Sequence, residues 1–236
     1  MLLPDVLFKY YSPARIQTIE DGAMRFTPPT DFNDTFDSDY LISTTAPKAR
    51  VARGRYRSNL GIFCLTRNPN NHLMWVHYAA QNTGFVVGFN TSAPVFSVGD
   101  SLLDEIDYTD DPLLVVPRTS DPPLKIALTK STDWSYEQEW RCVRTFQTEE
   151  SRDVYFNPDA INEIILGSRM ADHDVSRLLR YANVSKVHGG HEVVVSDSKP
   201  MRKTRRFERE PSDRMLCSEC DGAGYIRDKS KAPGHH

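Results

Sequence analysis

Short apolar runs that alternate with polar, turn-rich stretches are the feature that most constrains how this chain can fold. Runs typical of strands occur at VLFKYY, LGIFCLT, GFVVGF, QEWRCVRTF, EIILG and HEVVV, and helix-like stretches separate some of them. No regular strand–helix–strand period links the runs, which argues against a parallel sheet covered by helices on both faces. The pattern predicts an α+β fold with a mixed or mainly antiparallel sheet and flanking helices.

The length of the chain allows one substantial domain and an appendage. Its 236 residues are 39% hydrophobic and 26% charged, which is ordinary for a globular protein. After about residue 198 the apolar periodicity is lost, and charged and turn residues dominate. We therefore predict one domain at residues 1–198 and a basic, partly flexible tail at residues 199–236.

Membrane insertion and secretion are not expected. No apolar run approaches the roughly 20 residues that cross a bilayer, and the first residues lack a basic region followed by a long apolar block. Cys64 and Cys142 lie in strand-like contexts rather than in a disulfide framework. We expect a cytoplasmic protein without membrane contacts, and the sequence does not indicate an oligomeric state.

Several helix boundaries are marked by capping residues. Ser12 followed by Pro13 predicts the start of a short helix that runs to about Asp21, with Gly22 at its end. Further helices are expected at residues 71–79, 124–132 and 172–182, and the basic residues 46–58 are compatible with another. LLDEIDY is expected to form a strand.

A cluster of large side chains lies in the helix expected at residues 71–79. Met74, Trp75, His77 and Tyr78 fall within five residues. Side chains of this kind are usually core, but an aromatic wall for a flat ligand is the alternative. Because a helix face holds only some of them, we expect Met74 and Trp75 to pack and Tyr78 to remain available for stacking.

Two glutamates form the second notable pattern. In a strand, Glu137 and Glu139 would project to the same face. Two neighbouring carboxylates repel, so the pair requires a raised pKa, a nearby cation or a ligand. Stabilisation of a developing positive charge is one use, and a solvated edge strand with Arg141 and Arg144 as partners is the alternative.

Four motifs occur in the order FKYYS, FNDTFD, MWVHY and EQEWR. This order resembles a family of uncharacterised bacterial domains and, more broadly, the ADP-ribosyltransferase superfamily. The resemblance covers roughly residues 6–146. It implies an ADP-ribosyltransferase-like split sheet and a transferase that consumes NAD and modifies a protein or nucleic-acid acceptor, of the kind found in toxin or phage-defence systems.

The resemblance also implies roles for individual residues. Glu139 would be the catalytic glutamate and Glu137 would orient the acceptor, with a spectator role as the alternative. Tyr78 would stack on nicotinamide, with Trp75 and His77 as alternates. Lys9, Tyr10 and Ser12 stand on the first strand where the superfamily usually has a His or Arg that holds NAD, and Thr35 replaces a proline of the loop motif.

For the remaining candidate binding residues, the sequence does not define a role. The diphosphate of NAD needs cationic donors, for which Arg15, Arg25, Arg53 and Arg55 are candidates beside Lys9. Asn33, Asp34 and Asp37 either border the site or hold the shape of their own loop. A nuclease that uses Asp34, Asp37 and Glu139 with a metal has the residue types without a recognisable spacing.

The tail contains a second possible site. Cys217 and Cys220 form a Cys-x-x-Cys pair in CSECDGAG, similar to half of a zinc-binding unit in DnaJ-type chaperones. Tetrahedral zinc needs four ligands, which His235 and His236 would complete, and a free thiol pair or a dimer-bridging site is the alternative. The alternative function for the whole chain is a non-catalytic nucleic-acid or protein binding module that uses this basic tail.

Overall fold

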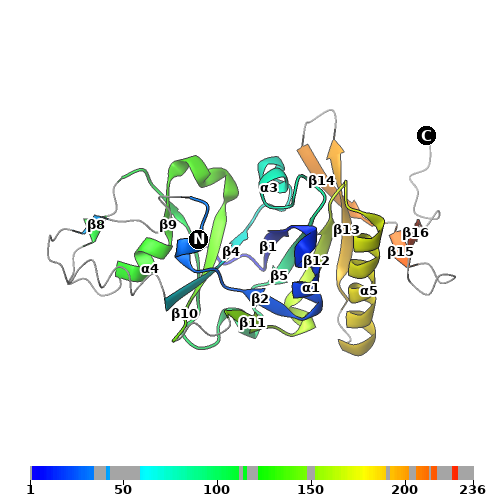
Figure 1. Ribbon diagram of the computed structural model, residues 1–236, viewed down its shortest axis with the longest axis horizontal. Helices are drawn as coiled ribbons and strands as arrows, with labels where there is room; N and C mark the ends of the chain where they lie inside the picture. The colour runs from blue at the N-terminus through cyan, green and yellow to red at the C-terminus, as the bar shows by residue number, and fades with distance from the viewer. Residues whose placement is uncertain are drawn as a thin grey trace. The chain divides into compact units, whose positions relative to one another are not determined.

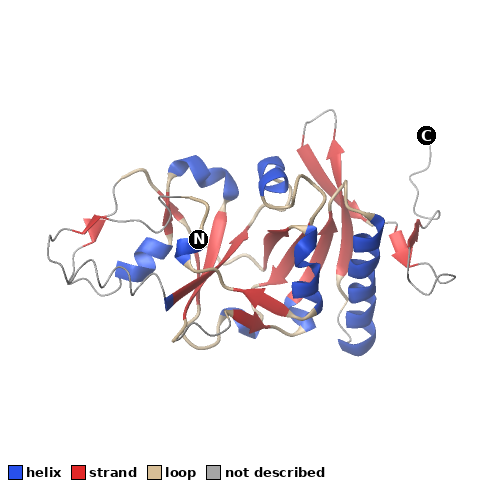
Figure 2. Ribbon diagram, in the orientation of Figure 1, coloured by secondary structure: helices blue, strands red, loops and turns tan. Residues whose placement is uncertain are grey.

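The computed structural model describes residues 2–34, 41–42, 59–111, 114–115, 122–147, 152–189, 192–201, 206–212, 214–216 and 225–227. Its largest sheet is mixed and has eight strands, drawn in red in Figure 2. In sheet order these are β14 (Arg206–Pro211), β13 (Val194–Met201), β12 (Ile161–Leu166), β5 (Phe85–Asn90), β1 (Val6–Tyr11), β4 (Leu60–Thr66), β10 (Glu139–Thr145) and β6 (Leu102–Glu105). The predicted α+β class and mixed sheet are confirmed; the ADP-ribosyltransferase-like arrangement stays a prediction.

The chain forms two compact units that are interleaved in sequence. The first unit comprises Met1–Pro4, Ala23–Arg67 and Ser92–Phe156, and the second comprises Asp5–Gly22, Asn68–Thr91 and Asn157–His236. Within the described residues, no helix is long and apolar enough to span a bilayer.

The first unit is built around β4 and β10. Besides β4, β6 and β10 it contains β2 (Ala23–Arg25), η2 (Pro29–Asp31), β3 (Leu41–Ile42), η3 (Pro94–Phe96), β7 (Asp107–Tyr108), β8 (Leu114–Val115), α4 (Pro122–Ala127), β9 (Thr129–Lys130), η4 (Thr132–Glu137) and β11 (Asp153–Tyr155). β10 pairs antiparallel with β4 on one side and with β6 on the other. Leu60, Ile62, Ala127 and Val143 form a buried cluster that joins the two central strands to α4.

The second unit combines antiparallel strands with one long helix. Its further elements are η1 (Pro13–Arg15), α1 (Ile16–Glu20), α3 (His72–His77), η5 (Pro158–Ala160), α5 (Asp172–Gly189), β15 (Arg214–Leu216) and β16 (Tyr225–Arg227). β1 pairs antiparallel with β5, and β5 with β12. α5 runs alongside β13 and connects β12 to it, and these two strands are parallel (Figure 1). A parallel pair requires such a long crossover.

Capping residues place the short helices where the sequence predicts them. Ser12 is the residue before η1, Pro13 is its first residue, and Gly22 follows α1 with a left-handed φ of 65°. Ile16 and Ile19 of α1 are fully buried. Asn71 begins α3, because its side chain accepts hydrogen bonds from backbone N–H groups in the first turn.

Two expectations differ from the structure. The helix expected at 124–132 ends at Ala127, because Thr129 and Lys130 instead form β9, which pairs in parallel with β7. The strand expected across LLDEIDY is interrupted at Ile106, between β6 and β7. Residue 198 lies inside β13, which continues to Met201 and pairs with β14, and the division into a domain at 1–198 and a tail stays a prediction. The helix considered at residues 46–58 lies outside the described residues.

A left-handed turn follows α3 in the second unit. Ala80, Gln81 and Asn82 have φ values of 46°, 56° and 69°. The Asn82 carbonyl accepts a hydrogen bond from Arg169 N at 3.0 Å. Gly167 packs so closely that a Cβ there would lie 2.4 Å from the Asn82 carbonyl oxygen. A glycine is therefore required at this approach of two backbones.

Candidate active site

The two glutamates come from different kinds of backbone. Glu139 is the first residue of β10, whereas Glu137 is the last residue of the 3-10 helix η4. Gln138 between them has a left-handed conformation with φ 47°. The expected projection from one face of a strand is therefore wrong for Glu137, because the left-handed residue ends the helix and turns the chain before the strand begins.

The two carboxylates nevertheless converge, because Lys130 lies between them. Lys130 Nζ is 2.7 Å from Glu137 Oε2 and 3.0 Å from Glu139 Oε2. The side chains of Lys130, Glu137 and Glu139 are 7%, 4% and 5% exposed. β9 ends at Lys130, and η4 brings the chain back to Glu137. The cation that the sequence pattern required is thus supplied by the chain itself.

Arg141 completes this group from the same strand as Glu139. Its Nε donates to Glu139 Oε1 at 2.8 Å, and its Nη2 donates to Glu139 Oε2 at 3.2 Å. Nη1 donates to the carbonyl of Ala127 at 2.8 Å, and the guanidinium lies over the Phe32 ring. Arg141 is fully buried. We call Lys130, Glu137, Glu139 and Arg141 the charge quartet; it holds two cations and two anions.

The charge quartet keeps Glu139 ionised. Burial alone would raise the pKa of Glu139, but Arg141 and Lys130 lower it, to about 2. A hydrogen bond with the Cys64 side chain acts in the same direction. Burial would lower the pKa of Lys130, but Glu139 and Glu137 hold it above its ordinary value. At neutral pH Glu139 and Lys130 are therefore both charged.

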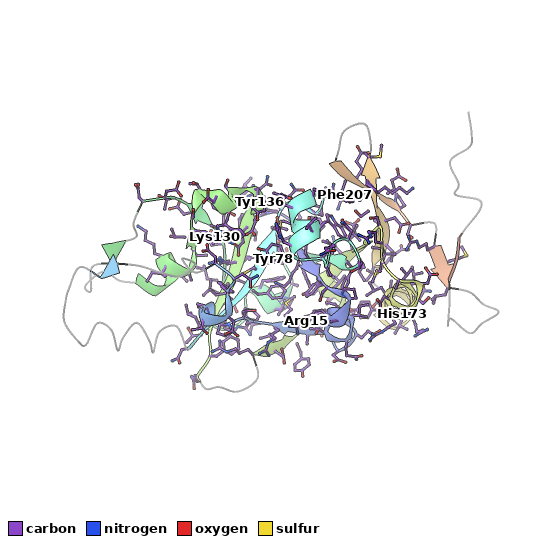
Figure 3. The ribbon with its side chains drawn as sticks, turned by 45° about the horizontal axis from the view of Figure 1, so that its top comes forward. Arg15, Tyr78, Lys130, Tyr136, His173 and Phe207 are labelled. Atoms are coloured by element: carbon purple, nitrogen blue, oxygen red, sulfur yellow. The ribbon has the colours of Figure 1, made fainter. Side chains whose placement is uncertain are left out.

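Aromatic side chains border the charge quartet. Lys130 Nζ lies 4.7 Å from the centre of the Trp134 ring, a cation–π distance. Trp134 and Tyr136, both half-buried on η4, have ring centres 6.1 Å apart. The Tyr108 hydroxyl accepts a hydrogen bond from Glu139 N at 2.8 Å, and burial raises the pKa of Tyr108. Figure 3 labels Lys130 and Tyr136 among the side chains of this unit.

The exposed Asp110 carboxylate binds the residues at the start of η4. Its carboxylate accepts hydrogen bonds from Ser131 Oγ at 3.1 Å and from Thr132 N at 2.9 Å. The Thr132 hydroxyl donates to the other carboxylate oxygen. These bonds lower the pKa of Asp110, with the Thr132 hydroxyl contributing most. An exposed carboxylate therefore holds the helix that carries Trp134, Tyr136 and Glu137.

The helix with the aromatic cluster divides its side chains as the sequence predicts. Trp75 is fully buried and donates from Nε1 to the Pro69 carbonyl at 2.9 Å, and Met74 is also buried. Tyr78, at the C-terminal end of α3, is half-buried and His77 is exposed. Their ring centres are 6.3 Å apart. Trp75 is thus a core residue, whereas His77 and Tyr78 keep surface toward solvent.

The candidates on β1 differ in how their polar atoms are used. The Tyr10 hydroxyl donates to the Asn68 carbonyl at 2.8 Å and accepts from Asn71 N at 3.2 Å, and burial raises the pKa of Tyr10. Tyr10 thereby fixes the loop that leads into α3. Lys9 is half-buried, with Nζ 5.9 Å from the Tyr11 ring centre, and Ser12 is half-buried before η1. Lys9 and Ser12 remain candidates for contact with NAD.

The proposed partners Glu139 and Tyr78 belong to different units. Glu139 lies in the first and Tyr78 in the second. Their meeting across one cleft depends on how the units are placed and stays a prediction. Lys9, Tyr10, Ser12, Trp75 and His77 share the second unit with Tyr78, and Glu137 shares the first with Glu139.

Several other expected residues contribute little to this picture. Arg15 is exposed, and Arg25 Nη1 lies 3.6 Å from Asp153 Oδ1 at the surface. Asn33 is exposed and Asp34 half-buried. Arg53, Arg55, Thr35, Asp37, Cys217, Cys220, His235 and His236 lie outside the described residues. Among the residues that are described, no group of three or more metal-ligating side chains forms.

Sequence reasoning missed Lys130, Tyr108 and Asp110. Lys130 carries a usable signal, because it is the single basic residue between Lys125 and Arg141, a stretch that includes both glutamates. Arg144, one of the two arginines considered as partners, instead donates from Nε to Ser101 Oγ at 2.8 Å. Only Arg141 of that pair contacts Glu139.

The comparisons with known proteins support a family but no activity. Residues 74–142 match the family described as Protein of unknown function (DUF2971). This segment begins in α3 and ends in β10, so it contains MWVHY, EQEWR and the whole charge quartet. No curated protein and no solved structure matches the chain. The predicted resemblance to uncharacterised domains is confirmed for these residues, and no link to ADP-ribosyltransferases is shown.

Proposed function

We propose that this chain is an ADP-ribosyltransferase that consumes NAD and modifies a protein or nucleic-acid acceptor. The observation that carries the proposal is the ionised Glu139 at the first position of a central strand. The resemblance assigns the catalytic glutamate to this position. The family match over residues 74–142 includes Glu139 and overlaps both this strand and the helix that ends at His77.

In the proposed reaction the bond between ribose C1 and the nicotinamide nitrogen breaks, and its electron pair leaves with nicotinamide. A lone pair of the acceptor forms the new bond to C1, and the acceptor proton passes to solvent. Positive charge develops on the ribose, and the Glu139 carboxylate stabilises it. Glu137 orients the acceptor.

The expected contribution of Glu139 is large. One charge pair at about 4 Å and an effective dielectric constant near 20 is worth about 4 kcal/mol, or roughly a thousandfold in rate. A neutral residue of the same shape should therefore abolish most of the activity. Since Glu139 also neutralises Lys130 and Arg141, a loss of folding must be separated from a loss of chemistry.

The test measures nicotinamide released from NAD by the full chain, alone and with cell extract. Glu139→Gln and the charge-balanced Lys130→Gln/Glu139→Gln variant should both lose at least about a thousandfold. Glu163→Gln, which disturbs the Glu163–Arg209 ion pair in the second unit, is the matched control and should retain activity. Unchanged release by folded Glu139 variants, or no nicotinamide from the wild type or from any other folded variant, would refute the proposal.

The alternative is a non-catalytic module that binds nucleic acid or protein through the basic tail. It predicts binding that weakens with salt and does not depend on Glu139. Two of the basic side chains described there already have acidic partners, since Lys199 pairs with Glu210 and Arg209 with Glu163. Exposed pairs of this kind are weak, so the salt dependence of binding is the measurement that decides between the two functions.

A further inference from the structure

The Lys130 ammonium fills the space between the two proposed catalytic carboxylates. Its Nζ contacts one oxygen of each carboxylate, at 2.7 Å from Glu137 and 3.0 Å from Glu139. Arg141 takes the second oxygen of Glu139 and shares the first with Lys130. Both oxygens of the proposed catalytic carboxylate are thus already neutralised by cations of the chain.

A developing positive charge on the substrate cannot share this space with an ammonium group. Lys130 and Arg141 already contact this buried carboxylate, and both would repel a third positive charge there, because water does not screen the repulsion. A carboxylate with two cationic partners also has little attraction left for a third. Glu139 can stabilise the ribose cation only after Lys130 has withdrawn.

We propose that Lys130 is an internal plug that holds the acid pair in a closed, resting form. Withdrawal of Lys130 with β9 and the beginning of η4 opens Glu139 to the ribose of NAD, while Glu137 keeps its place at the end of η4. The inference rests on the proposed transferase function and adds its regulation. While the plug is in place, the ammonium also prevents repulsion between the two buried carboxylates, which stabilises the resting protein.

The two ends of the segment that carries the plug are held by different contacts. At its beginning β9 pairs with β7, and Asp110 binds Ser131 and Thr132. At its end Thr66 Oγ1 donates to the Glu137 carbonyl at 2.5 Å, and Gln138 has the left-handed φ of 47°. We call the Asp110 contacts the latch, because their loss frees the beginning of the segment and leaves Glu137 held.

The Trp134 ring gives the plug a second support within the same segment. Lys130 Nζ lies 4.7 Å from the ring centre, so the ammonium and the indole can move together. Trp134 is half-buried on η4, and Figure 3 shows Lys130 near Tyr136 of the same helix. The plug, its aromatic support and the acceptor-side Glu137 therefore belong to one short stretch of chain, residues 129–138.

The plug is tested by removing it without unbalancing the buried charges. Lys130→Met/Glu137→Gln removes one cation and one anion and leaves the Glu139–Arg141 pair in place. With water as the acceptor, nicotinamide release should increase at least about tenfold over the wild type. The apparent KM for NAD should fall as well, because a larger fraction of the protein is open. Addition of Glu139→Gln should abolish the increase.

A second variant tests the latch and leaves the charge quartet intact. Asp110→Ala removes the carboxylate that holds Ser131 and Thr132, and it should raise nicotinamide release several-fold. Asp111→Ala, at the adjacent exposed acid, is the matched control and should release nicotinamide at the wild-type rate. Thermal melts of every variant establish that the protein is folded.

The outcomes separate the plug from the proposed function. If the wild type releases nicotinamide in a Glu139-dependent manner but the folded plug and latch variants are equally or less active, Lys130 is a positioning residue and the plug is refuted. If neither the wild type nor any variant releases nicotinamide, the transferase function is refuted and the plug with it. Only faster, Glu139-dependent release by both variants supports the plug.

Discussion

Replacement of Glu139 by glutamine tests the charge quartet as a structural group, apart from any activity. The change preserves the shape of the side chain and removes its charge, so Arg141 loses the charge of Glu139, while Lys130 keeps its contact with Glu137. Breaking a buried ion pair by removing one partner costs about 3–5 kcal/mol. Glutamine keeps one carbonyl acceptor for the Lys130 and Arg141 donors that both Glu139 oxygens now bind.

We therefore expect Glu139→Gln to lower the free energy of unfolding by about 3 kcal/mol, the lower end of the 3–5 kcal/mol range. For a chain of 236 residues this corresponds to a decrease in Tm of roughly 6–12 °C. The charge-balanced Lys130→Gln/Glu139→Gln variant should lose less than the sum of its two single variants, by about 1–3 kcal/mol.

Urea denaturation followed by circular dichroism measures these differences. Glu163→Gln serves as the control, because its partner Arg209 is 42% exposed and such a pair contributes about 1 kcal/mol or less. A Glu139→Gln protein within about 1 kcal/mol of the wild type would contradict the reasoning, especially if its effect were additive with Lys130→Gln. Glu139 would then have to be solvated and independent of Lys130.

Three further predictions follow from single features of the structure. The pKa of Glu139 is lowered from its ordinary value of 4.5 to about 2. Its contribution to the free energy of unfolding is therefore present above pH 4.5 and is lost as the pH falls toward 2. Between these pH values, urea denaturation should show that the wild type loses stability more steeply than Glu139→Gln. Gly167→Ala should lower the free energy of unfolding by about 1–3 kcal/mol, because its Cβ would lie 2.4 Å from the Asn82 carbonyl oxygen. The control Ser168→Ala, at the exposed neighbour, should change this free energy by less than about 0.5 kcal/mol. Burial raises the pKa of Cys142 to about 11, so mass spectrometry should find Cys142 unmodified by iodoacetamide in the native protein at pH 8 and modified in urea; rapid native modification would show that β10 is not buried.

Local patterns predicted the elements that depend on nearby residues. β4 coincides with LGIFCLT because its residues are apolar and mostly buried. The helix expected at 71–79 is α3 at His72–His77, and Asn71 caps it because its side chain accepts from N–H groups of the first helical turn. The division of that helix into a packed Trp75 and a partly exposed Tyr78 followed from helix geometry alone.

The charge quartet was only half predictable. The Glu139–Arg141 contact follows from their spacing in one strand. The role of Lys130 does not, because it depends on β9 pairing with β7 and on the turn through η4, both of which are tertiary features. The left-handed conformation of Gln138 was equally hidden, since glutamine has no preference for it that a sequence pattern would reveal.

The interleaving of the two units limits how this protein can be taken apart. β1 pairs with β5, with Val6 opposite Asn90, while residues 23–67, between these strands in the chain, belong to the other unit. Neither unit is one continuous stretch of sequence, so no single cut releases an intact half. During synthesis β1 cannot pair until β5, some 80 residues later in the chain, has left the ribosome. Expression of either half as a separate fragment should therefore yield an incomplete fold, and the whole chain is the smallest unit on which function can be measured.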